Sequence, residues 1–212
     1  MRILITVILL LASSTLLAFA QPAYVSLNCG DPYDTLHGPY DYAAPSEKAR
    51  QQLPLVEAYH FTRVTETLGK SDRVAKHYGN LHYTLRVFPN HHRALNTLSR
   101  LSRLAPVPPG KRDSVMHPDC YFERAVKFRP EDPVVRLLYG IHLHMQKKLP
   151  QAQKHYEKAL AIEPNYVEAH YNLGLLYFDM QHYDKAREEA KFAYERGYPL
   201  DGLKNKLSKV KP

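Results

Sequence analysis

The chain has 212 residues, of which 24% are charged, and a formal net charge of +8 at pH 7. This length is enough for one domain with a continuous core. Its basic residues do not form a Lys/Arg cluster with interleaved aromatic side chains, so the sequence argues against a nucleic-acid-binding protein.

Residues 1–20 have the three parts of a secretory signal peptide. Arg2 supplies the positive charge, residues 3–11 the apolar run, and residues 17–20 a small-residue cleavage site. Polar residues at 13–15 interrupt the apolar stretch, which is short of the roughly 20 apolar residues that a spanning helix prefers. We expect cleavage before the glutamine at position 21, a periplasmic or secreted product, and no stable membrane insertion.

Residues 21–52 are predicted to form an extended arm. This segment is rich in Gly, Pro, Asp and Tyr up to residue 46, and its Asp-Pro-Tyr-Asp at 31–34 is echoed by Pro-Tyr-Asp-Tyr at 39–42. Tails without fixed structure are usually poor in aromatic residues, so we expect the arm to lie on the rest of the protein. The sequence leaves open whether the arm occupies a binding groove.

Residues 53–130 are predicted to contain two degenerate helical hairpins. The first would use helices at 55–68 and 73–87, and the second would begin with 90–104, where apolar residues recur at helical spacing. A Pro-rich insert at 105–119 then delays the last helix of this part, which ends at Arg129.

A period of 34 residues runs through the C-terminal part of the chain. Gly140 recurs as Gly174, and Ala159 recurs as Ala193. In residues 166–180 the apolar and small side chains recur at intervals of three and four, which places one stripe against a partner helix. Glycine and alanine at the crossing points would let two helix backbones approach closely.

These residues resemble the tetratricopeptide repeat (TPR), a unit of two antiparallel helices. In the last full unit the family pattern is carried by Ala169, Leu173, Gly174, Tyr177, Tyr183, Ala186, Ala193 and Pro199. The large aromatic residue of the first helix is His170 here, a departure from the family. Segments 38–42 and 88–95 also resemble a set of exported bacterial TPR proteins, which carries no activity with it.

The resemblance implies an all-α fold, a TPR-like superhelical stack of about four helical hairpins preceded by the irregular arm. Two well-matched units would occupy residues 131–198, and residues 199–212 would form a C-terminal cap.

The same resemblance implies a protein–protein interaction module, such as an adaptor, scaffold or assembly factor. In TPR proteins the first helix of each unit lines a concave groove, which here would be apolar and aromatic. The groove positions predict a partner-binding set of Leu137, Ile141, His144, Tyr171, Asn172, Leu175 and Phe178. Such a groove suits another protein or peptide with hydrophobic anchors, unless the arm or a neighbouring helix covers these side chains.

Catalytic signals are missing from the sequence. We find no Gly-x-Ser-x-Gly, no His-Glu-x-x-His and no phosphate-binding loop, so we predict neither enzymatic activity nor a cofactor.

Cys29 and Cys120 are the two cysteines, and in an oxidising compartment they can form one disulfide. The bridge would close a loop of roughly 90 residues, worth about 4 to 5 kcal/mol in the chain-entropy model.

The alternative function is a metal-binding or redox-linked protein that uses His91, His92 and His117 with Cys120 and Cys29. The ligand spacing of a structural zinc site is missing. His91 and His92 are adjacent at a helix start and point about 100° apart, so they cannot both bind one ion without further ligands.

Overall fold

The computed structural model describes residues 29–35, 37–70, 73–105, 107 and 115–210, so the predicted signal peptide and most of the predicted insert lie outside the described residues. Within the described ranges the chain forms ten helices and no strand, which confirms the all-α prediction. None of these helices is long and apolar enough to cross a membrane. The helices are α1 (Glu47–His60), α2 (Arg63–Thr67), α3 (Val74–Val87), α4 (His92–Leu104), α5 (Pro118–Phe128), α6 (Pro133–Met145), α7 (Leu149–Ile162), α8 (Val167–Asp179), α9 (Tyr183–Glu195) and α10 (Gly202–Leu207).

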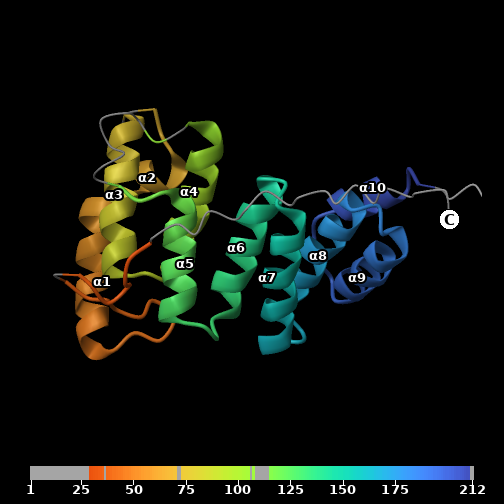
Figure 1. The fold of residues 1–212 in the computed structure, drawn as a ribbon, viewed down its shortest axis with the longest axis horizontal. Helices are drawn as coiled ribbons and strands as arrows, with labels where there is room; N and C mark the ends of the chain where they lie inside the picture. The colour runs from red at the N-terminus through yellow and green to blue at the C-terminus, as the bar shows by residue number, and fades with distance from the viewer. Residues whose placement is uncertain (1–28, 36, 71–72, 106, 108–114, 211–212) are drawn as a thin grey trace, which may run out of the picture.

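The helices form a row of hairpins that runs from α1 at one end to α10 at the other (Figure 1). α4 pairs with α5, α6 with α7, and α8 with α9. The first helices of these hairpins also contact one another in sequence, α4 against α6 and α6 against α8, and α10 packs on α8 and α9. The predicted stack of helical hairpins is therefore confirmed.

Small residues allow the close helix crossings that the repeat pattern predicts. A Cβ atom added to Gly140 would lie 2.5 Å from the Tyr156 ring, so α7 approaches α6 where only glycine fits. At Gly174 the same addition would lie 2.5 Å from Leu203 Cδ2. Each repeated glycine thus marks a contact between neighbouring helices rather than a flexible point.

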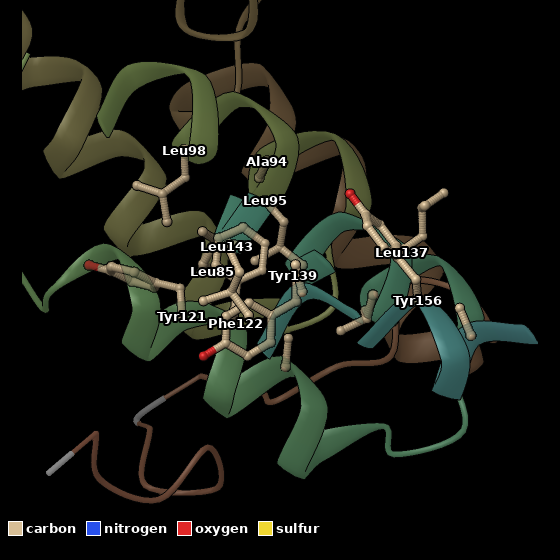
Figure 2. Close-up of a cluster of buried hydrophobic side chains, with 14 of the residues drawn as sticks. Leu85, Ala94, Leu95, Leu98, Tyr121, Phe122, Leu137, Tyr139, Leu143 and Tyr156 are labelled. Carbon is tan, nitrogen blue, oxygen red and sulfur yellow. The ribbon is translucent and has the colours of Figure 1, made fainter. Parts of the chain in front are cut away.

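Side chains from several hairpins meet in one continuous core (Figure 2). Leu85 of α3 and Leu95 of α4 are almost fully buried there with Phe122 of α5. The Phe122 ring stacks on the Tyr139 ring of α6, with centroids 5.1 Å apart. Because the core crosses from one hairpin to the next, no hairpin needs to be stable alone.

The N-terminal helices differ from their predicted bounds. α1 begins at Glu47 because the Ser46 hydroxyl accepts a hydrogen bond from the Ala49 amide, so residues 47–52 of the predicted arm are helical. The predicted single helix 55–68 is wrong. The chain leaves the helix after residue 60, and Thr62 caps the short α2 by accepting from the Thr65 amide.

The described arm, residues 29–35 and 37–46, packs on α3, α5 and the turn between α3 and α4. Cys29 and Cys120 form the predicted disulfide, which ties the arm to the first turn of α5. Further along the arm, the Tyr40 amide donates to the Val87 carbonyl oxygen at 2.8 Å. The Tyr42 ring stacks on the His91 ring with centroids 4.2 Å apart. The described arm contacts therefore lie away from the predicted groove residues on α6 and α8.

Candidate functional site

Part of the predicted groove is accessible on the neighbouring first helices α6 and α8. Ile141 on α6 is partly exposed, as are Asn172, Leu175 and Phe178 on α8. Met145, the last residue of α6, is 48% exposed. We call these five residues the first-helix face. It offers apolar and aromatic contacts with a single amide, which suits a segment with hydrophobic anchors.

Two predicted groove residues are buried, and the prediction that they face a partner is wrong for this structure. Leu137 is 1% exposed and lies in the central core near Tyr156 (Figure 2). Tyr171 is 6% exposed, and its ring packs on Tyr198 with centroids 4.3 Å apart. The physical reason is that α10 covers Tyr171, whose hydroxyl lies close to Gly202 at the start of that helix, and that Leu137 packs in the core that α6 shares with its neighbouring helices.

His144, the remaining member of the predicted set, belongs to a charged cluster around Asp179. The Asp179 carboxylate lies 3.3 Å from His144 Nε2, 3.4 Å from Lys147 Nζ and 2.8 Å from Lys206 Nζ. Burial lowers the pKa of His144 although Asp179 opposes that change. The cluster joins the ends of α6, α8 and α10, so His144 connects helices.

The residues of the metal-binding alternative do not come together. Cys29 and Cys120 are bonded to each other, so neither offers a thiolate. His91 Nε2 lies 3.1 Å from Glu57 Oε1, whereas His92 Nε2 lies 2.9 Å from Asp132 Oδ2. His117 Nδ1 accepts from the backbone amide of residue 119. Within the part of the chain that the structure describes, no group of three or more His, Cys, Asp or Glu side chains could hold a metal ion.

Sequence reasoning missed a buried polar network between α4, α5 and α6. His142 Nε2 lies 2.9 Å from Asp119 Oδ1, and His142 Nδ1 lies 3.1 Å from Ser99 Oγ. Burial alone would raise the pKa of Asp119. Hydrogen bonds from His142, Gln146 and Lys148 outweigh that effect, so the pKa of Asp119 lies below its usual range. The signal for this network in the sequence is Ser99, which stands in the predicted helix 90–104 where the first helix of a TPR unit has its glycine.

This order of serine, histidine and aspartate also occurs in hydrolases, but here it is enclosed. Ser99 is 3% exposed and His142 1% exposed. A cavity of about 580 Å³ lies beside the network, lined by Tyr78, Arg103, Met116 and Gln146 among others, and neither Ser99 nor His142 reaches it. A nucleophile needs contact with its substrate, so the network serves to hold three helices together.

Comparison with known proteins gives one family and one curated relative. Residues 140–181 match the family model described as TPR repeat. A stretch of 61 residues is 41% identical to the Hsp70-Hsp90 organising protein of Plasmodium falciparum (isolate 3D7). The match covers 29% of this chain and 11% of that protein, so it spans about a tenth of the relative's length.

Solved structures resemble the chain over more of its length. A thermophilic TPR protein of Thermus thermophilus is similar with a TM-score of 0.52 and 20% sequence identity, covering 77% of this chain and 85% of the other. MamA is similar with a TM-score of 0.46 and 17% identity, covering 77% and 89% of the two chains. The first of these likenesses supports the same fold, and at this identity it supports the fold alone.

Proposed function

We propose, from the premise that this chain is a tetratricopeptide-repeat protein, that it binds a segment of another protein on the first-helix face. It would act as an adaptor, scaffold or assembly factor and would catalyse no reaction. Repeat proteins of this kind use extended surfaces across neighbouring units for binding.

The observation that carries the proposal is the row of accessible apolar side chains across two packed first helices. Leu175 and Phe178 are partly exposed on α8, and Ile141 and Met145 are accessible on the adjoining α6. The described arm leaves this row uncovered. A few aromatic and aliphatic anchors of a partner would therefore supply most of the affinity.

We propose an exported compartment as the place of this interaction. The signal-peptide pattern at residues 1–20 supports export, and the disulfide between Cys29 and Cys120 supports an oxidising space such as a periplasm. Mass spectrometry of the envelope fraction should find a mature N-terminus at Gln21. A full-length chain retained in the cytosol would contradict export.

Photocrosslinking in intact cells tests the binding face. A photoreactive residue at Asn172 should capture a defined protein, and Met145→Asp should reduce that capture without changing the thermal unfolding of the chain, because Met145 is 48% exposed. The matched control places the photoreactive residue at Lys154, which is exposed on the second helix α7. Equal capture from Asn172 and Lys154, or capture that Met145→Asp leaves unchanged, would rule out the first-helix face.

A further inference from the structure

A second hollow lies between the arm and helices α3 and α5, on different elements from the first-helix face. Its volume is about 260 Å³. Arm residues 29–31 and Asp34 form one wall, and His82, Arg86 and Arg124 contribute to the other. We call this space the arm hollow.

Arg124 is unusual because it is buried without a carboxylate partner. The residue is 5% exposed. Its Nη1 donates to the carbonyl oxygens of Cys29 and Asp31 and its Nη2 to that of Pro32, while its Nε is buried and has no hydrogen-bond partner among the described residues. It forms no ion pair within the described part of the chain. A buried charge normally needs such a partner, because removing it from water is costly.

Arg86 brings a second guanidinium to the same hollow. Its Nη2 donates to the Asp34 carbonyl oxygen at 3.2 Å, and it too lacks an ion pair among the described residues. Burial lowers the pKa of Arg124 and the charge of Arg86 lowers it further, whereas the charges of Asp31 and Asp34 oppose this change in part. The two arginines therefore repel each other across a space that a negative group could fill.

The acidic groups nearby offset this charge only in part. Asp34 lines the hollow, and the Asp31 carboxylate accepts from the Tyr33 amide at 3.0 Å and lies 3.6 Å from Lys127 Nζ. Asp31 is thus shared with Lys127, which lies outside the lining of the hollow, and the two arginines face the carboxylates of Asp31 and Asp34. His82, which also lines the hollow, is engaged through Nδ1 with the Tyr121 hydroxyl at 2.8 Å.

We propose that the arm hollow binds a small oxyanion, a phosphate or carboxylate group, between Arg86 and Arg124. Planar guanidinium groups present paired N–H donors that match both kinds of oxyanion. The bound anion would supply the partner that the buried Arg124 lacks, and it would hold the arm against α3 and α5.

Titration of the oxidised full chain with inorganic phosphate at constant ionic strength tests this proposal. Binding is followed by calorimetry and by the NMR signals of the His82 ring, which lines the hollow. We expect saturable binding that Arg86→Gln weakens about tenfold or more, the range expected for a lost charged hydrogen bond. The matched control is Arg103→Gln, which removes an exposed arginine on α4 and should bind phosphate like the original chain.

A parallel titration with acetate separates the two ligand sources. Saturation by acetate and not by phosphate assigns the site to a carboxylate, and the reverse assigns it to a phosphate. Arg86→Lys keeps the positive charge and provides a second variant if Arg86→Gln fails to fold, and it should bind more weakly than the original chain because the paired donors are gone. Absence of saturation by both anions, or equal affinity in the original chain and the Arg86 variants, overturns the proposal.

Discussion

At the scale of single residues, the repeated glycines can be tested by adding one methyl group. Gly140→Ala would drive a Cβ atom into the Tyr156 ring, so α6 and α7 would have to separate. We expect the free energy of unfolding to fall by about 1–3 kcal/mol, as for other overpacked cores. Urea unfolding measures the change.

The matched control is Gly79→Ala in the middle of α3, where an added Cβ atom meets nothing within 4 Å. Alanine is the better helix former, so this variant should gain about 0.5–1 kcal/mol. Equal effects of the two substitutions would show that helix propensity, and not the close crossing, explains Gly140.

His91 makes stability depend on pH. Its Nδ1 accepts from the Ala94 amide at the start of α4, and its Nε2 lies 3.1 Å from Glu57 Oε1, so both nitrogens are used by the neutral ring. Burial lowers the pKa of His91 from 6.5 to about 3, and nearby Arg93 contributes. Below pH 6.5 the unfolded chain therefore binds a proton that the folded chain does not.

Acid should therefore destabilise the folded chain through His91. Stability should be lost as the pH falls from 6.5 towards 3, with His91 contributing about 1.4 kcal/mol per pH unit once the unfolded chain is fully protonated. His91→Asn can keep the capping hydrogen bond and removes the titration. The variant should be less stable near neutral pH because ring packing is lost, but its stability should fall less steeply below about pH 5.5. Parallel curves for the two proteins from urea unfolding would contradict this role.

At the scale of elements, the disulfide fastens the arm to the stack. We expect the double variant Cys29→Ser and Cys120→Ser to lose about 2–5 kcal/mol of unfolding free energy. The disulfide lowers the conformational entropy of the unfolded chain by closing a long loop, and the variant loses this effect. Reduction of the original protein should give the same loss. An unchanged urea midpoint in both experiments would show that the arm is held by its other contacts alone.

The short helix α10 closes the other end of the stack. Leu203 is fully buried and packs in a cluster with Tyr171 and Ala193. Leu203→Ala should lower the unfolding free energy by about 2–5 kcal/mol, whereas the exposed Lys204→Ala on the same helix should leave it nearly unchanged. Equal stability of both variants in urea unfolding would show that α10 is not required as a cap.

The elements that the sequence predicted well are those with a repeated small-residue pattern. α6 to α9 follow the 34-residue period closely, because glycine and alanine are needed where helices cross. The break after α1 depends on the local capping of Thr62, which competes with a continuous helix and leaves no trace in the apolar spacing.

The candidate site was predicted only in part for a different reason. A first-helix position is exposed or buried according to the other helices that pack on it, and the sequence of α8 alone does not show that α10 covers Tyr171. The hydrogen bonds from Arg124 to the arm could not be predicted from the sequence either, because the partners are backbone carbonyl oxygens. Pairing of Cys29 with Cys120 was predictable because the chain has two cysteines.

At the scale of the whole molecule, the two proposed sites lie on different parts of the stack. The first-helix face uses α6 and α8, whereas the arm hollow uses the arm, α3 and α5. The principal helix contacts are within one hairpin or between adjacent hairpins (Figure 1). In such a quasi-one-dimensional molecule, local stability is set mainly by each unit and its neighbours.

This arrangement predicts that a destabilising substitution at one end of the stack affects mainly the helices at that end. In native-state hydrogen exchange, the Cys29→Ser and Cys120→Ser variant should lose protection chiefly in α3 to α5, because the arm packs there. Leu203→Ala should lose protection chiefly in α8 and α9, since α10 contacts those helices. The helices between these regions, α6 and α7, should change least in each variant. If both variants instead lowered protection equally from α3 to α9, the stack would unfold as one cooperative unit, and the nearest-neighbour description would be wrong.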